Sequence, residues 1–445
     1  MDVTRTLARY VLASRYADIP ADVKHEAARS FLNWVGCAVG AAKHDTVARA
    51  LAALQPFSGP AEASVLGRKD KVDIMLAALM NGITSHTFDF DDTHLKTVIH
   101  PSGPVASALL ALAERMPVSG EDFMHAFILG VEVECRIGNA VYPNHYDTGW
   151  HITGTTGVFG AAAACGRLLG LDEQQMVWAL GIAATQSSGL REMFGTMCKP
   201  FHPGNAAKNG LMAALLAKQN FTSSNQGIEA KRGFANVLST KFDPAQITEN
   251  LGKTFEISIN TYKPFACGIV IHPIIDACVQ LRNEHNLKAE DIESIHADVH
   301  YLVLELTGKR TPQVGLEGKF SVFHSAAVAI IYGAAGESEY SDEVVQDKTV
   351  IALRDRMDAT VEQGVHEDQA RVTIKLKNGT VYEKFVEHAI GSLDRPMTDA
   401  NLEAKFRGLS NPILGKDATD RLIALCWKTA ELKNVADIAK AAVPA

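Results

Sequence analysis

Apolar positions recur at spacings of three and four along the first half of the chain. This spacing predicts that residues 3–238 are almost entirely helical. Capping residues support the prediction, since Ser119 and Asp172 each stand just before an apolar helical pattern. The Gly/Ala-rich stretch 153–170 predicts a helix packed at close range in the interior of a bundle.

The hydrophobic pattern changes after about Pro264. Residues 292–306 and 370–388 alternate apolar and polar positions and are rich in β-branched and aromatic residues, which predicts strands. The dipeptide Asn378-Gly379 divides the second stretch and predicts a hairpin with a type I′ turn, in which both residues have positive φ. The second half of the chain is therefore expected to contain a sheet.

Helical spacing returns between and after these strands. It covers residues 320–333 and 342–357, and it resumes after Met397 to end near Ala439. The chain is thus predicted to be mainly α with a smaller α+β domain. We expect a large helical domain built from both chain ends, residues 1–267 and 395–445. Residues 268–394 are expected to form an inserted α/β lid.

Composition narrows the class of protein. The 445 residues are enough for two or three domains of about 100–200 residues each. Apolar residues are 47% and charged residues 21%, which is typical of compact globular proteins. A net charge of -8 without a basic run argues against a nucleic-acid partner. Charges interrupt every early apolar stretch, so we expect a cytoplasmic protein with no membrane partner.

Seven cysteines are scattered along the chain without a Cys-x-x-Cys pair. An odd, dispersed set does not form a disulfide framework. A zinc ribbon or an iron–sulfur cluster would also lack obvious ligands. We therefore expect no cofactor held by cysteine.

The densest polar cluster lies in residues 85–103, SHTFDFDDTHLKTVIHPSG. Acidic residues near a helix start capped by Ser102 are ordinary structural features, while Asp and His together also suit a divalent cation. No second carboxylate cluster supplies the remaining ligands, so we expect no metal. The polar side chains of the cluster are Asp89, Asp91, Asp92, Thr93, His94, Lys96 and His100.

Three further segments place reactive side chains near a predicted helix start. They are GWHITGTTG with His151, TMCKPFHPGNAAKNG with Lys199 and His202 before a helix opening at Pro203, and KPFACGIVIHP with Cys267 and His272. Each has a structural alternative, namely a core histidine, a solvated lysine or a buried inert cysteine.

The four segments share one arrangement. In each, a group that can carry a proton or a positive charge lies just ahead of a predicted helix: His100, His151, Lys199 and Cys267. Helix N-termini carry partial positive charge and unpaired N–H groups, which favour carboxylates. If these helix starts converge, they form a pocket for a multiply negative small acid. A carbanion beside a carboxylate could be stabilised there, with lysine or histidine as acid or base.

The order of these motifs resembles the MmgE/PrpD superfamily over nearly the whole chain. The matching strings are DFDDTH, IHPSG, GWH before a Gly/Ala helix, TMCKPFHPGNAAKNG and PFAC with His272 downstream. The family contains 2-methylcitrate dehydratase, cis-aconitate decarboxylase and iminodisuccinate epimerase. The resemblance implies a helical domain built from both chain ends, an inserted α/β lid, and a homodimer without metal.

The resemblance also implies roles for particular residues. Five positions match the aspartate, threonine, two histidines and lysine of the decarboxylase active site: Asp89, Thr93, His100, His151 and Lys199. Cys267 stands where the animal decarboxylase has histidine, as in the fungal decarboxylase and the epimerase. His324, in KFSVFHSAA, replaces the tyrosine of the decarboxylases, and Gly103-Pro104 replaces the Asp-Asn typical of the dehydratases. Because histidine can both take and give a proton near neutral pH, His324 favours proton transfer coupled to hydroxide loss.

These features predict a lyase that acts on a small di- or tricarboxylate by metal-free acid/base chemistry. A 2-methylcitrate-dehydratase-like hydro-lyase is the leading hypothesis. The alternatives are a cis-aconitate-type decarboxylase, an iminodisuccinate-type epimerase and a carboxylate-binding protein without turnover. We expect catalytic roles for His100, His151, Lys199, His324 and Cys267, and substrate binding by Asp89, Thr93, His202 and His272.

Overall fold

The capping signals in the sequence begin helices in the computed structural model, which describes residues 2–445. The Ser119 hydroxyl accepts the backbone N–H of Asp122 at the start of α6. Asp172 and Gln175 form a reciprocal capping box at the start of α9. The helices of this half are α1 (Val3–Ala13), α2 (Ala21–Gly40), α3 (Asp45–Leu54), α4 (Ile74–His86), α5 (Ser102–Arg115), α6 (Gly120–Val141), α7 (Asn144–Asp147), α8 (Ile152–Leu168), α9 (Glu173–Ala184), α10 (Cys198–Lys218), α11 (Phe234–Leu238) and α12 (Ala245–Thr248).

Helix α8 is the Gly/Ala-rich helix predicted from the sequence, and it lies at the centre of the bundle. It packs against α6, α5 and α10, and nearly all of its residues are buried. A Cβ at Gly160 would lie 2.7 Å from the carbonyl oxygen of Gly130 in α6. Glycine is therefore needed for the close approach of these two helices.

Short strands interrupt the helical half. Strands β1 (Ala63–Ser64) and β2 (Lys71–Val72) pair with each other, and β3 (Asp92–His94) pairs antiparallel with β4 (Asn260–Tyr262). The β3–β4 register places Thr93 opposite Thr261. The polar cluster after α4 consequently lies beside the chain just before it enters the α+β part.

The α+β part contains a four-stranded sheet of order β6-β5-β7-β8, with β5 and β6 parallel and the other pairs antiparallel. Helix α13 packs on β7 and β8 and contacts α16, which in turn packs on α18. The strands are β5 (Ile292–Val299), β6 (Met357–Val361), β7 (Ala370–Leu376) and β8 (Val381–Val386). The helices are α13 (His272–His285), α14 (Tyr301–Thr307), α15 (Gly315–Gly318), α16 (Val322–Tyr332), α17 (Asp342–Val345) and α18 (Lys348–Arg354).

Three sequence-based expectations for this part need correction. The strand expected over 292–306 ends at Val299, because the apolar residues from Leu302 onward follow helical spacing and form α14. The helix expected over 342–357 is divided into α17 and α18, since the Asp347 side chain begins a new helix.

The hairpin over 370–388 is present, but its turn is different from the predicted one. Gly379 has φ 89°, whereas Asn378 is not among the residues of positive φ in the described chain. The Gly379 N–H donates to Leu376 O at 2.9 Å, and the register pairs Lys375 with Val381. These bonds indicate a three-residue loop ending in a left-handed glycine, in place of a type I′ turn.

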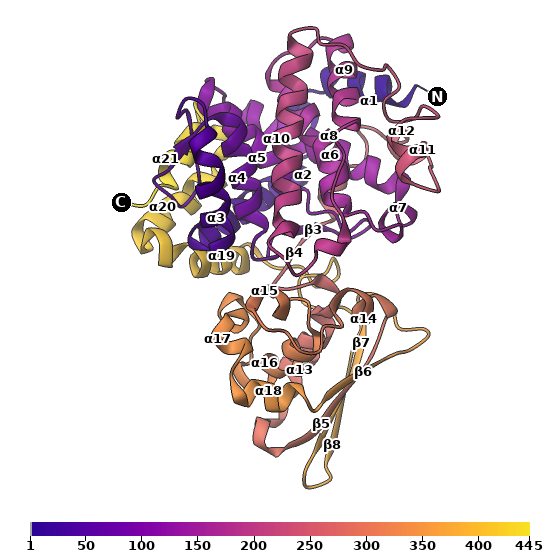
Figure 1. Ribbon diagram of the computed structural model, residues 1–445, viewed down its shortest axis with the longest axis vertical. Helices are drawn as coiled ribbons and strands as arrows, with labels where there is room; N and C mark the ends of the chain where they lie inside the picture. Colours follow the sequence, from indigo (N-terminus) through magenta and orange to yellow (C-terminus); the bar gives the residue numbers. More distant parts are fainter. Residues whose placement is uncertain (1) are drawn as a thin grey trace.

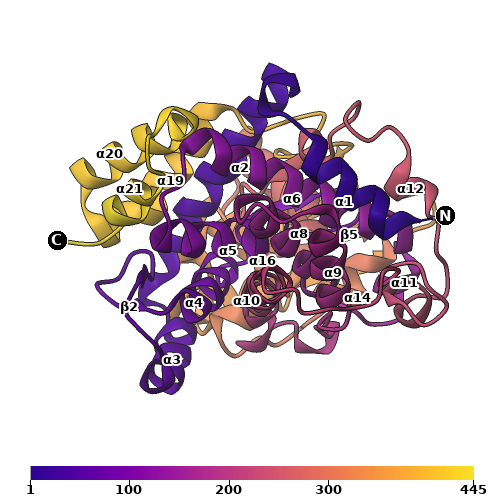
Figure 2. The same cartoon turned by 90° about the horizontal axis from the view of Figure 1, so that it is seen from above.

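The last helices pack on the first half of the chain. They are α19 (Asp399–Leu414), α20 (Lys416–Trp427) and α21 (Ala436–Ala441). Both α19 and α20 contact α2, and α21 contacts α5. Figures 1 and 2 show these yellow helices beside the indigo and purple N-terminal ones.

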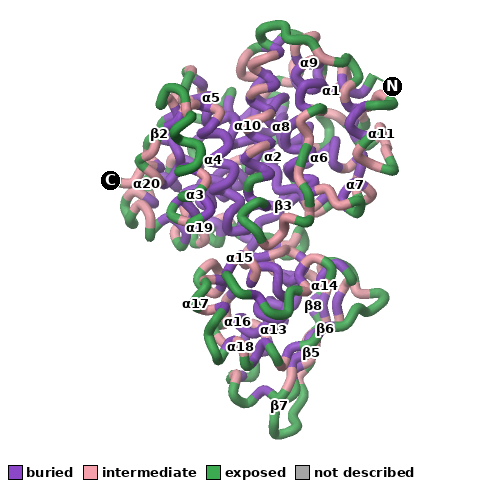
Figure 3. Tube along the Cα trace, in the orientation of Figure 1, coloured by how far each residue is buried: buried purple, intermediate pink, exposed green. Residues whose placement is uncertain are grey.

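Two hydrophobic cores follow from this arrangement. One joins residues between 3 and 262 with residues between 397 and 442, and the other is centred on residues 266–389. Figure 3 shows the buried segments gathered separately in the upper and lower parts of the molecule. The mainly α class with a smaller α+β part is thus confirmed. The boundaries at 267/268 and 394/395 stay predictions, and Met1 lies outside the described residues.

Within residues 2–445, no helix combines the length and apolar character that crossing a membrane requires.

Candidate active site

A narrow cavity of about 50 Å³ lies where the helical and α+β parts meet. This volume holds only a few water molecules. Five residues expected at the site line it together: Asp89, Thr93, His100, His151 and Lys199. The other lining residues are Val98, Tyr146, Phe194, Lys263, Gly268, Ile269, Val270, Leu306, Thr307 and Phe320.

The carboxylate of Asp89 holds two lysines at the wall of this cavity. Its Oδ1 accepts from Lys199 Nζ at 2.7 Å and from Lys263 Nζ at 2.8 Å. Lys263 Nζ also donates to the Asp89 backbone carbonyl at 2.9 Å. Although burial alone would raise it, the two ammonium groups hold the pKa of Asp89 well below its usual range. The three groups together carry one net positive charge.

Lys263 was missed by the sequence analysis. It directly follows β4, and the pairing of β3 with β4 brings it beside the polar cluster. Its contact with Asp89 spans 174 positions in the sequence. No local sequence pattern indicates such a contact. The available signal was that Lys263 lies close to the expected junction between the two domains.

The position of Lys199 corrects the expected start of a helix. Helix α10 begins at Cys198, so Lys199 and His202 lie inside its first turns and Pro203 is within the helix. Proline is favoured at helix starts, which explains why the sequence suggested a later one. A Cβ at Gly204 would clash with the carbonyl oxygen of Leu79 in α4. This close packing brings Lys199 to the loop that carries Asp89.

His100 is held in a single tautomer. Its Nδ1 lies 2.8 Å from the backbone carbonyl oxygen of Asp92, which can only accept, so Nδ1 carries the hydrogen. Burial lowers the pKa of His100 well below its ordinary value, against the opposing effect of Asp91. The ring is therefore neutral, and Nε2 keeps a lone pair for the cavity.

His151 precedes α8 as predicted and contacts a second histidine. Its Nδ1 lies 2.8 Å from Nδ1 of His202, so one of these nitrogens donates to the other. Burial lowers the pKa of His151 well below its usual range, and it lowers that of His202 to about 4. His202 is not among the described residues that line the cavity, and it supports His151 from behind.

His86 is a further member of the cluster that the sequence analysis did not select. Its Nδ1 donates to Asp91 Oδ2 at 2.8 Å, and its ring centroid lies 4.7 Å from that of His100. Among residues 2–445, nothing bonds to its buried Nε2. His86 ends α4 and is three residues before Asp89, so its membership of the same polar cluster was the available signal.

The histidines could in principle hold a metal ion. One ring nitrogen from each of His86, His100 and His151 lies within 4.8 Å of the others, and Asp89 and Asp91 form a second such group with two of them. The Asp89 carboxylate is already occupied by two ammonium groups, whose charges oppose a cation. The same charges suit a carboxylate ligand.

Three expected site residues lie elsewhere in the described chain. Cys267 is fully buried, its thiol bonds to the Tyr340 side chain, and burial raises its pKa to about 12. His324 lies in α16, where its Nε2 donates to Glu339 O at 3.0 Å. His272 lines a neighbouring pocket. The catalytic roles expected for Cys267 and His324 gain no support from these positions, and His272 does not line the small cavity.

Comparison with known proteins agrees with this arrangement of motifs. The MmgE/PrpD N-terminal domain matches residues 5–247, and the MmgE/PrpD C-terminal domain matches residues 265–429.

Individual relatives align over most of their length. A cis-aconitate decarboxylase-like protein, oryM, of Aspergillus oryzae is 26% identical over 95% of this chain and 93% of its own. The human cis-aconitate decarboxylase is 26% identical over 86% of this chain and 81% of its own. The 2-methylcitrate dehydratase of Salmonella typhimurium is 22% identical over 89% of this chain and 86% of its own.

Proposed function

The chain belongs to the MmgE/PrpD family, and from this premise we propose that it is a lyase of small di- or tricarboxylates. We propose further that it works as a hydro-lyase, removing a proton α to a carboxylate and hydroxide from the neighbouring carbon. The observation that carries this proposal is the neutral His100, whose free Nε2 belongs to the same cavity as Lys199. A neutral imidazole is a suitable base for such a proton.

In the proposed reaction, His100 Nε2 takes the proton as the C–H bond breaks. The electron pair spreads onto the adjacent carboxylate, whose oxygens face the ammonium groups of Lys199 and Lys263. Hydroxide leaves the neighbouring carbon as water after it receives a proton from the Lys199 ammonium group. Burial lowers the pKa of Lys199 despite the opposing effect of Asp89, and this makes the lysine a better proton donor.

Decarboxylation is the second candidate reaction. The relatives named as cis-aconitate decarboxylases are 26–27% identical, against 22% for those named as 2-methylcitrate dehydratases. His324, which favoured dehydration in the sequence, lies outside the cavity. Loss of carbon dioxide from an unsaturated acid leaves the same kind of carbanion, which Lys199 would protonate.

The test is to incubate purified protein with citrate, 2-methylcitrate and cis-aconitate in deuterated water. NMR would identify the products, and released carbon dioxide would be measured separately. An alkene formed without carbon dioxide supports the hydro-lyase, whereas carbon dioxide from cis-aconitate supports the decarboxylase. His100→Asn should lose the activity, while the surface variant His25→Asn should keep it. Deuterium exchange without net conversion would indicate an epimerase, and binding without turnover a carboxylate-binding protein.

We also propose that the protein is a cytoplasmic homodimer that binds neither nucleic acid nor membrane. The support is the family resemblance, together with the net charge of -8. Light scattering of the purified protein should give twice the chain mass of 48.0 kDa. A monomeric mass would contradict the dimer.

A further inference from the structure

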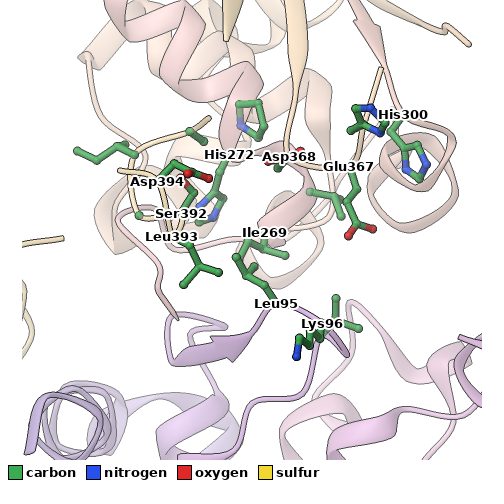
Figure 4. A pocket seen from close by; sticks show the side chains of 17 residues that line it. Leu95, Lys96, Ile269, His272, His300, Glu367, Asp368, Ser392, Leu393 and Asp394 are labelled. Carbon is green, nitrogen blue, oxygen red and sulfur yellow. The ribbon is translucent and has the colours of Figure 1, made fainter. Parts of the chain in front are cut away.

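A second, much larger pocket adjoins the candidate active site. It has a volume of about 540 Å³ and lies between the loop after β3 and four segments of the α+β part. Figure 4 shows Leu95, Ile269 and Leu393, from three separate segments, in this pocket. Val98, Val270 and Ile390 add further apolar wall.

The two cavities meet at an apolar boundary. Val98, Ile269 and Val270 line both of them. Val98 has φ 54°, a left-handed conformation that a β-branched residue rarely adopts. Strain of this kind persists only where the surrounding structure enforces it, often at ligand sites. Because the residues at this boundary are apolar, the part of a bound molecule that crosses it from the Lys199 side should also be apolar.

The charges of the two cavities differ. Lys199 and Lys263 line the small cavity beside Asp89, whereas the larger pocket carries three carboxylates, those of Glu367, Asp368 and Asp394, and one lysine, Lys96. These carboxylates disfavour a further anionic group in the larger pocket. The carboxylate next to the reacting carbon accordingly belongs in the small cavity.

His272 adds no charge to the wall of the larger pocket. His272 lines this pocket and is only 3% exposed. Its Nε2 has no hydrogen-bond partner in the part of the chain that the structure describes. Burial lowers the pKa of His272 to about 3, so the ring is neutral and can face an uncharged group.

On the basis of the proposed function, we propose that the larger pocket holds an uncharged alkyl substituent of the substrate. The substrate class is then a di- or tricarboxylate that carries an alkyl chain longer than methyl. The small cavity has no room for such a chain, whereas the adjoining pocket is about ten times larger and has apolar walls near the shared boundary. Burial of each methylene should raise kcat/KM by up to about fourfold.

The experiment compares citrate, 2-methylcitrate and its propyl and hexyl homologues as substrates of the purified full-length protein, with the matching alkylated cis-aconitates in parallel. We expect kcat/KM to rise with chain length in whichever series is turned over. Equal or falling values with longer chains would overturn the inference and leave the proposed function intact. Failure to convert any acid of either series would instead reject the proposed function.

Two variants test whether the larger pocket causes the rise of kcat/KM with chain length. Leu393 is 46% exposed and lines only the larger of the two pockets. Leu393→Asp should therefore fold and should lower kcat/KM for the hexyl substrate about tenfold. Turnover of 2-methylcitrate should change less than twofold. The matched control is Leu54→Asp, at a leucine 36% exposed on α3. Preference for a 6-aminohexyl over the hexyl homologue would overturn the inference, because it would show recognition of a cation by the carboxylates.

Discussion

Lys199 Nζ lies 2.7 Å from Asp89 Oδ1, and both side chains are nearly completely buried at the wall of the candidate active site. Asp89 does not depend on this lysine alone, since Lys263 Nζ lies 2.8 Å from the same oxygen. The roles of the two lysines can therefore be tested separately. One can be removed while the carboxylate keeps a partner.

Lys199→Met should lower kcat by about 10²–10⁴-fold, because the proposed proton donor is lost. The thermal melting temperature should change little, since Lys263 still neutralises Asp89. Lys218→Met, at the exposed end of the same helix, is the control and should keep wild-type activity. Unchanged turnover in a folded Lys199→Met protein would show that this lysine is only structural.

Asp89→Asn should be strongly destabilising, in contrast to Lys199→Met. Removing one partner of a buried ionic group leaves charges uncompensated, at a cost of about 3–5 kcal/mol. Here two ammonium groups would lose their shared carboxylate. Urea denaturation measures the loss, with Asp18→Asn at the exposed ion pair with Arg15 as a control that should show no measurable change. Equal stability of the two variants would contradict the ionic role of Asp89.

Stability should fall as the pH drops from about 6.5 toward 4. The pKa of His202 is about 4 in the folded protein, and that of a free histidine is about 6.5. Between these values the unfolded chain binds a proton that the folded protein does not, so the free energy of unfolding decreases with acidification. For His202 alone the loss is about 2 kcal/mol at pH 5. Urea midpoints at pH 7 and pH 5 test this, and His202→Gln should show the smaller difference.

Activity should not require a metal ion. Lys199 and Lys263 place positive charge beside the only described histidine cluster that could ligate one. We expect elemental analysis of active protein to find no stoichiometric iron, zinc or magnesium, and turnover to survive dialysis against EDTA. Stoichiometric metal, with activity that chelation abolishes and metal restores, would contradict this.

His324→Ala should reduce stability more than turnover. The ring is fully buried against Tyr340 and donates to Glu339 O, and it lies outside the candidate active site. Activity per folded molecule should stay within about twofold of wild type, with a lower melting temperature. A large fall in kcat at an unchanged melting temperature would restore the catalytic role that the sequence suggested.

Local structure was largely predictable from local sequence. The caps at Ser119 and Asp172 and the hairpin over 370–388 depend on contacts between residues a few positions apart. The exceptions were also local: the turn at Asn378 and the strand end at Val299 depend on small differences in backbone preference. Several conformations were compatible with the same short pattern there.

The candidate site was predictable only in part. The clustered motifs and the family resemblance selected Asp89, Thr93, His100, His151 and Lys199, which the fold brings to one cavity. The sequence did not select Lys263, because its approach to Asp89 depends on the pairing of β3 with β4 across 174 positions. Nor could the sequence show that His324 lies outside the cavity. Side-chain direction at such positions is decided by helix packing between distant segments, which no local spacing records.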